Sequence, residues 1–165
     1  MKEEIQKTYG GTVRVRAVGV LVENDSILMV KHAGLGHQGY LWIPPGGGVE
    51  LGASLEDTVI REFEEETGLE ISVTEFLFVN EFIDNGLHAI EIFFRVKRLG
   101  GKLKVGTDPE LSVGNQIIKE VKFLNIQDLQ NEGREKVHSR FCDLSSLEEL
   151  NVSKGVFNFK NIYLK

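Results

Sequence analysis

Three glutamates are spaced so that one face of a helix would present them together. Glu62, Glu65 and Glu66 stand at i, i+3 and i+4, and residues at this spacing are neighbours on a helix surface. Like charges held this close repel each other, and a hard divalent cation relieves the repulsion by binding their oxygens. Oxygen ligands suit Mg²⁺ or Mn²⁺. An acidic helix face that is merely solvated is the alternative interpretation.

A run of prolines and glycines precedes these glutamates. Pro44 and Pro45 are followed by Gly46, Gly47 and Gly48, and such a run cannot form the interior of a helix. Glycine lets the backbone approach a ligand closely, and a glycine-rich turn entering a helix presents N–H groups to phosphate. We therefore expect the three glycines to form a turn that binds the substrate. A turn without a ligand is the alternative.

The residues after the glycines predict a helix from about Ser54 to Gly68. Ser54 can accept from the backbone N–H of Asp57, and Asp57 can reach back in a capping-box arrangement. Gly68 suits the left-handed residue that often ends a helix. Apolar residues between these ends recur at helical spacing and form a stripe that faces the core. They are Leu55, Val59, Ile60 and Phe63.

The segment from Gly47 to Leu69 is similar to the signature of the Nudix hydrolases. That signature is a glycine, five residues, a glutamate, seven residues, and then Arg-Glu-apolar-any-Glu-Glu-any-Gly-apolar. Eight of the nine specified positions match. They are Gly47, Arg61, Glu62, Phe63, Glu65, Glu66, Gly68 and Leu69. The remaining position, a glutamate in the family, is Ala53 in this chain.

The resemblance implies a set of roles for the residues that match. Glu62, Glu65 and Glu66 would ligate the divalent cation, and Arg61 would pair with a carboxylate and orient it. The implied reaction is hydrolysis of the diphosphate linkage in a nucleoside diphosphate joined to another group. A carboxylate would take the proton from the attacking water, and we expect Glu62 or Glu110 in this role. Glu110 is alternatively an extra metal ligand or a solvated loop carboxylate.

Two other functions are considered beside hydrolysis, and one departure from the signature motivates the first of them. Ala53 removes a carboxylate that supports the metal site in relatives, so a nucleotide-binding sensor or regulatory domain with little turnover is an alternative. Isomerisation of an isoprenoid diphosphate, also known in Nudix-like folds, needs a cysteine at the active site. The only cysteine, Cys142, lies far beyond the motif, and we rank this reaction last.

We predict that residues outside the signature determine substrate specificity, because binding residues generally lie on loops. Tyr40 and Trp42 could stack on a base or sugar, with core packing as the alternative. The loop 107–116 is the other expected contributor. The substrate-specific marker residues of some family branches are absent, since Asp84 and Gly86 occupy those positions. The histidines lack paired metal-ligand spacing and are interpreted as packing or surface residues, with His32 and His37 as weak substrate-side candidates. They are His32, His37, His88 and His138.

Length and charge limit the partners. The chain has 165 residues, which fits one domain, so we expect residues 1–165 to form a single domain. It carries 25 acidic and 19 basic residues and a net charge of −6. This balance argues against nucleic acid or an anionic membrane as the main partner. A small-molecule nucleotide substrate stays compatible, because a metal can supply the positive charge. A homodimer is left open.

The N-terminal composition and the cysteine count favour a cytoplasmic location. Residues 1–11, MKEEIQKTYGG, are charged and contain no apolar signal-peptide core. No apolar run approaches the ~20 residues of a transmembrane helix. A single cysteine excludes an intrachain disulfide, which fits a reducing compartment.

Alternating and β-branched runs predict the remaining elements. Residues 12–22 and 27–32 favour a hairpin, and 71–83 and 88–98 favour a second one. Shorter strands are expected at 41–44, 117–125 and 156–164, and helices at 126–131 and 141–150. Periodicity alone predicts only a mixture of α and β. The resemblance implies a Nudix-like α/β/α sandwich, with a mixed β-sheet and the signature helix packed on it.

Overall fold

The computed structural model describes residues 7, 10–84, 86–109, 111, 113–152 and 154–160. The strands, in chain order, are β1 (Val13–Glu23), β2 (Ser26–Ala33), β3 (Tyr40–Ile43), β4 (Gly46–Gly48), β5 (Leu69–Asp84), β6 (Leu87–Gly101), β7 (Ile118–Leu124) and β8 (Val156–Lys160). The helical elements are α2 (Leu55–Thr67), the 3₁₀ turn η1 (Val113–Asn115), α3 (Ile126–Glu132) and α4 (Glu149–Val152). In the described part of the chain, no helix is long and apolar enough to cross a membrane.

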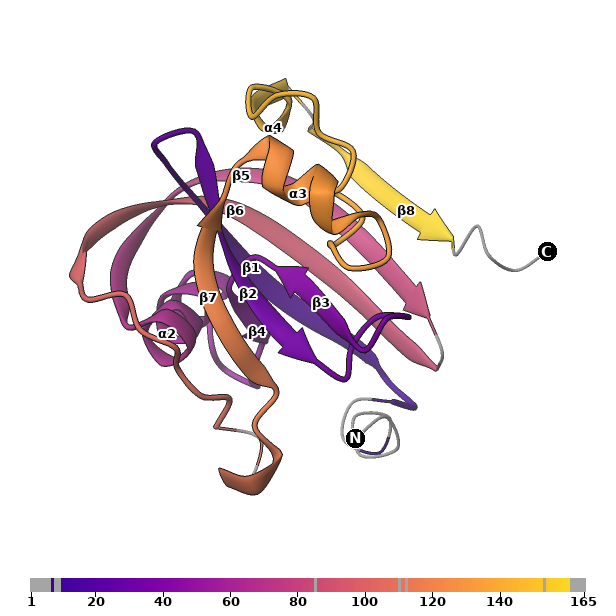
Figure 1. Cartoon of the computed structure of the whole chain (residues 1–165). Helices are drawn as coiled ribbons and strands as arrows, with labels where there is room; N and C mark the ends of the chain where they lie inside the picture. The colour runs from indigo at the N-terminus through magenta and orange to yellow at the C-terminus, as the bar shows by residue number, and fades with distance from the viewer. Residues whose placement is uncertain are drawn as a thin grey trace.

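The strands pair around β1. Their order is β3-β2-β1-β6-β5-β8, while β4 also pairs with β1 and β7 also pairs with β2. The β1–β6 and β5–β8 pairs are parallel, and the other pairs are antiparallel. Figure 1 shows α2 on one side of these strands and α3 with α4 on the other. The predicted α/β sandwich with a mixed β-sheet is confirmed.

Both predicted hairpins are present. β1 and β2 are joined through Asn24 and Asp25, which have φ values of 48° and 56°. Two consecutive left-handed residues are the signature of the hairpin turn that matches the twist of the strands. β5 and β6 form the second hairpin, and both of its strands run longer than the sequence suggested. These two strands are the longest of the sheet among the described residues.

α2 begins and ends at the predicted residues. Ser54 is the N-cap and accepts from the Asp57 N–H at 3.0 Å, and Gly68 ends the helix with φ 70°. The hydrogen bond from the N-cap backbone N–H to the Asp57 side chain, expected in a capping box, is replaced by another. The Ser54 hydroxyl donates to the Asp57 carboxylate at 2.7 Å, so the two side chains bond each other. A complete capping box is found instead at α3, between Asn125 and Asp128.

Two buried clusters lie on the two faces of the sheet. The cluster under α2 includes Val59 and Phe63. A side chain at Gly19 of β1 would clash with both of them, because its Cβ would lie 2.9 Å from Val59 Cγ1. The larger cluster lies on the α3 side and includes Trp42, Phe78, Phe93 and Phe141. Gly19 therefore allows α2 to pack closely on β1.

The C-terminal third differs in part from the prediction. α3 is present, but the helix expected over 141–150 is reduced to α4, preceded by turns. Here Phe141, Leu144 and Leu150 are buried in the larger cluster, so their spacing reflects core packing without a continuous helix. The strand expected over 156–164 is described as far as Lys160, and residues 161–164 lie outside the described chain.

The expected glycine turn is instead a short strand. Gly46, Gly47 and Gly48 form β4, which pairs antiparallel with β1. None of the three has a positive φ, so the requirement for glycine comes from close approach. A Cβ on Gly46 would lie 2.5 Å from the Ala17 carbonyl oxygen, and one on Gly48 would lie 2.6 Å from Arg14 Nη2. The prediction of a turn was wrong because the residues read as turn formers also permit tight pairing.

Candidate metal and substrate site

Glu66 connects the signature helix to the glycine strand. Only 4% of the residue is exposed. Its Oε2 accepts from the backbone N–H of Gly46 at 3.1 Å, and its Oε1 lies 3.3 Å from His32 Nε2. Glu66 therefore accepts from the Gly46 N–H, which we expected from the sequence to bind phosphate. Direct binding of phosphate by Gly46, Gly47 and Gly48 stays a prediction.

Glu62 occupies the space that Gly47 leaves open. A Cβ on Gly47 would lie 2.6 Å from Glu62 Oε2, so any larger residue there would displace the carboxylate. The Glu62 side chain is only 12% exposed, and its Oε1 accepts from Arg61 Nη2 at 2.9 Å. Burial raises the pKa of Glu62 to about 8, and the nearby Glu66 charge adds to the rise while Arg61 opposes it. Negative charge at this position is therefore undercompensated.

Arg61 lies between two carboxylates. Its Nη1 donates to Glu50, and its Nη2 donates both to Glu62 and, at 3.3 Å, to the Gly48 carbonyl. Burial lowers the pKa of Arg61, but Glu50 and Glu62 outweigh it and the net pKa is raised. The structure thus brings Arg61 and Glu62 together as the resemblance implied.

Glu65 lies at the end of α2 where the loop after β6 arrives. The N–H of Gly106 donates to the Glu66 carbonyl at 2.9 Å, and that of Thr107 donates to the Glu65 carbonyl at 3.2 Å. These bonds satisfy carbonyls at the C-terminal end of the helix that have no partner within it. Burial raises the pKa of the Glu65 carboxyl, Arg61 opposes the rise, and Asp108 in the arriving loop adds to it.

The second candidate base lies outside the described residues. Glu110 belongs to the loop 107–116, and its own placement is not described. The described neighbour Asp108 is close enough to affect Glu65. The predicted roles of Glu110 as base or ligand therefore stay predictions.

The donor set of this face fits a hard divalent cation in its chemistry. It offers carboxylate oxygens from Glu62, Glu65 and Glu66, and the raised pKa of Glu62 records charge that a cation would compensate. Within the described chain, no group of three His, Cys, Asp or Glu side chains is already gathered around one point. Binding of a cation by all three glutamates would therefore require their carboxylates to turn toward the ion.

A buried polar network supports the other side of the glycine strand. Arg16 on β1 donates to the Gly46 carbonyl at 2.9 Å and to Glu91 at 3.3 Å. Glu91 on β6 is buried and also accepts from Asn80 at 2.9 Å, and it lies 2.7 Å from His138 Nε2. Burial alone would raise the pKa of Glu91, but His138, followed by Arg16 and Asn80, lowers it to about 2.

Sequence reasoning missed several residues of this arrangement. His138 was expected to be a packing residue, and its burial agrees with that. His32 was only a weak candidate, although its ring contacts Glu66. Arg16 and Glu91 carried one usable signal: each is a charged residue inside an otherwise apolar strand, which implies a buried partner. The identity of that partner could not be inferred, because the members are distant in sequence.

Tyr40 and Trp42 do not lie with the glutamates. In the β2–β3 pair, Trp42 is opposite Lys31 and Leu41 is opposite His32. Directly paired residues share a face and successive residues alternate, so Tyr40 and Trp42 face away from the side where His32 meets Glu66. Trp42 is fully buried in the larger cluster. Its burial favours the alternative interpretation, core packing, over stacking on a base.

Tyr40 has partners of its own. It packs partly buried against the larger cluster, donates to Glu132 at 2.7 Å, and has Lys31 Nζ 4.1 Å from its ring centroid. The hydrogen bond with Glu132 is the main cause of its raised pKa. These contacts hold Tyr40 on the α3 side, so its expected role at the same site as the glutamates is not supported.

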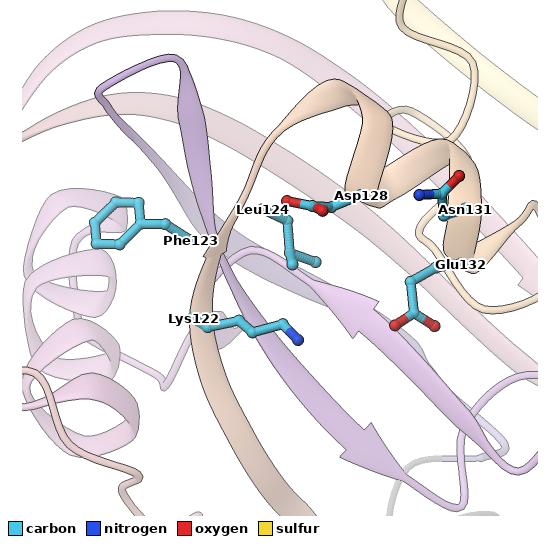
Figure 2. Close-up of a pocket in the computed structure, with 6 residues that line it drawn as sticks. All are labelled: Lys122, Phe123, Leu124, Asp128, Asn131 and Glu132. Atoms are coloured by element: carbon cyan, nitrogen blue, oxygen red, sulfur yellow. The ribbon is translucent and has the colours of Figure 1, made fainter.

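A pocket of about 460 Å³ lies next to α3. It is lined by Lys122, Phe123, Leu124, Asp128, Asn131 and Glu132. Figure 2 shows Phe123 directed toward α2, whereas the other five side chains lie on the α3 side of β7. The pocket is therefore separated by the sheet from the face of α2 that carries the glutamates. It is not the site at which those glutamates would act.

Comparison with known proteins places this arrangement in a family. The NUDIX domain model matches residues 13–144. An ADP-ribose pyrophosphatase of Methanocaldococcus jannaschii is 34% identical over 113 residues, which are 67% of this chain and 61% of that relative. A MutT-like protein of Streptomyces ambofaciens is 35% identical over 88 residues, or 53% of each chain. The alignments thus span less than two thirds of these relatives' lengths.

Solved structures support the same fold. The crystal structure of a UDP-X diphosphatase superposes with a TM-score of 0.62 at 22% identity, and the match covers 95% of this chain and 72% of that one. The family model covers most of the chain, including β1, the glycine strand, α2 and the network behind it. The chain belongs to the NUDIX domain family.

Proposed function

We propose that the protein is a hydrolase that uses a divalent cation to cleave the diphosphate linkage of a nucleoside diphosphate joined to another group. The signature helix supports this proposal, because it supplies Glu62, Glu65 and Glu66 on one face beside Arg61. The relative from Methanocaldococcus jannaschii is named as an ADP-ribose pyrophosphatase. ADP-ribose is therefore the first substrate to test.

The observation that carries the proposal is the burial of two carboxylates within one turn of α2. Glu62 and Glu66 are both shielded from water, and Glu62 has Arg61 as its only cationic hydrogen-bond partner in the described chain. A helix that needed these residues only for solubility would expose them, since carboxylates are rarely buried, and the partners of Glu62 still leave its pKa raised. Their burial is best explained by a ligand that carries positive charge.

Enzymes of the NUDIX family generally use divalent metal ions. We propose that Glu62, Glu65 and Glu66 hold Mg²⁺ or Mn²⁺, since both ions accept oxygen ligands. When bound, such an ion neutralises charge on the diphosphate and lowers the pKa of water. Gly47 leaves the space in which the Glu62 carboxylate lies, and Arg61 fixes its orientation.

The protein's residues would then handle the proton of the attacking water. Glu62 is one candidate base, because its carboxylate would lie beside the proposed ion and within reach of a water bound there. Glu110 is the other candidate. Water adds an oxygen to one phosphorus, and the bridging oxygen leaves with the other phosphate. The products are a nucleoside monophosphate and a phosphorylated remainder.

A panel of nucleotides tests the proposal directly. ADP-ribose, sugar nucleotides, dinucleoside polyphosphates and nucleoside triphosphates are incubated with the protein in ¹⁸O-labelled water, with Mg²⁺, with Mn²⁺ or with EDTA. We expect a monophosphate product and one labelled phosphate from at least one compound, only when the metal is present. Turnover that persists in EDTA, or no turnover of any compound by folded protein, would contradict the proposal.

Ala53 motivates one alternative, a nucleotide-binding sensor on the same fold. The three helix glutamates argue against it, because a pure binder does not need all of them. Calorimetry on the same panel separates the two functions. Tight binding of a nucleotide without any product, measured by chromatography under the same conditions, would favour the sensor.

A further inference from the structure

The turn between β4 and α2 contains a carboxylate that the family signature does not specify. Glu50 is followed by Leu51, Gly52 and Ala53, and the Ala53 N–H donates to the Glu50 carbonyl at 3.0 Å. The other end of this turn is fixed, because the Val49 N–H donates to the Val15 carbonyl of β1 at 2.9 Å. Glu50 therefore stands at a defined position, three residues before the one at which the signature has its glutamate.

The side chain of Glu50 reaches the signature arginine. It accepts a hydrogen bond from Arg61 Nη1, while Arg61 Nη2 holds Glu62 and the Gly48 carbonyl. Arg61 Nε is buried and has no hydrogen-bond partner among the described residues. The two ends of the guanidinium group are thus anchored separately, and Glu50 is the anchor of the end that does not touch Glu62.

We infer that Glu50 replaces the missing signature glutamate as the positioning residue of this site, by holding Arg61 in the orientation that binds Glu62. The inference rests on the proposed function, because Glu62 is taken as a ligand of the cation. Glu50 itself is largely exposed, with 65% of its side chain accessible, so its pair with Arg61 adds little to folding stability. Its contribution is orientation, since a planar guanidinium group transmits the position of one partner to the other.

Three variants and one matched control test this inference. They are Glu50→Ala, Ala53→Glu, the double variant that combines these two changes, and the control Glu56→Ala, which removes an exposed carboxylate from the first turn of the same helix. Each is measured for kcat and KM on the best substrate, for Mn²⁺ affinity by calorimetry without substrate, and for thermal unfolding in EDTA.

We expect Glu50→Ala to lower kcat and to weaken Mn²⁺ binding, each by about 10-fold, which is the lower end of the loss caused by removing a direct partner of a metal ligand, because Glu50 acts on Glu62 through Arg61. KM should change by less than about 2-fold, and the unfolding temperature should match that of Glu56→Ala. Ala53→Glu should restore most of both losses in the double variant, because it returns a carboxylate to the same turn.

Two results would overturn the inference alone. One is a Glu50→Ala protein that matches Glu56→Ala in both kcat and Mn²⁺ affinity. The other is a loss that Ala53→Glu does not restore, which would give Glu50 a role other than the one missing at position 53. A parent protein that neither turns over any substrate nor binds Mn²⁺ would instead overturn the proposed function, and the inference with it.

Discussion

At the scale of single residues, Glu62 and Glu66 show how the same side chain can differ within one helical turn. Glu66 is paired with the Gly46 N–H and lies beside His32, whereas Glu62 relies on Arg61. The sequence predicted both as neighbours on one face, because helical spacing alone determines that. Which of them is paired depends on β2 and β4, whose approach could not be inferred from spacing within the helix.

The raised pKa of Glu62 predicts a dependence of stability on pH in metal-free protein. Its pKa rises from the ordinary 4.5 to about 8 on folding, so the protonated form is favoured in the folded state. Relative to Glu62→Gln, the parent protein should be at its most stable below pH 4.5 and should lose stability as the pH rises through 8. Differential scanning fluorimetry in EDTA from pH 5 to 9 measures this difference.

We expect Glu62→Gln to unfold at least about 3 °C above the parent at pH 9, since 1 kcal/mol moves the midpoint of a chain this size by about 2–4 °C. Glu64→Gln is the control, because Glu64 is exposed on the same helix. If Glu62→Gln and Glu64→Gln gave the same midpoints across this range, Glu62 would not be the undercompensated charge.

At the scale of elements, α2 and β4 form the site together. α2 could be predicted from its period, its cap and Gly68, because all of these signals are local. β4 could not, because the three glycines carry no pattern of their own, and only the close approach of Glu62, Arg14 and Ala17 explains them. The loop after β6 was predicted to lie near the site. The sequence did not predict that N–H groups of this loop would donate to carbonyls at the end of α2.

The fit between β4 and Glu62 predicts that Gly47→Ala affects activity more than stability. The new Cβ would clash with the Glu62 carboxylate, which is the mobile end of a side chain and can move away. A carboxylate displaced in this way no longer meets Arg61 correctly, so kcat should fall by about 10-fold or more. The unfolding temperature should change by only a few degrees.

Gly100→Ala serves as the control, because an added Cβ there would meet, among the described residues, only the carboxylate of the exposed Glu70, at 3.1 Å, and Gly100 does not have a positive φ. Enzyme kinetics and thermal unfolding of both variants make the comparison. Parent-level kcat in Gly47→Ala would show that the position of Glu62 does not matter for turnover.

At the scale of the whole molecule, the Glu91 network ties together segments that are far apart in sequence. Arg16 lies 75 residues from Glu91, and His138 lies 47 residues from it. The resemblance predicted the general fold that brings these segments together. It could not predict the network, because nothing in the local sequence of Glu91 identifies His138 as its partner.

We expect Glu91→Gln to destabilise the protein at neutral pH by about 3–5 kcal/mol, because it removes the buried negative charge that Arg16 and His138 share. The pKa of Glu91 is lowered from 4.5 to about 2, so its stabilisation is present above pH 4.5 and is lost as the pH falls toward 2. Urea unfolding at pH 7 and at pH 3 measures both effects. A gap between parent and variant that widened on acidification would contradict this account.

The central claim is that the carboxylates of α2 hold the cation that hydrolysis requires. The most direct test is the rate of Glu66→Gln and Glu65→Gln at saturating Mg²⁺ on the best substrate of the panel, with Glu64→Gln as control. The account predicts that Glu64→Gln keeps the parent rate and that the other two lose about 10²-fold or more while remaining folded in EDTA. Near-parent rates in both Glu65→Gln and Glu66→Gln would show that this helix is not the metal site.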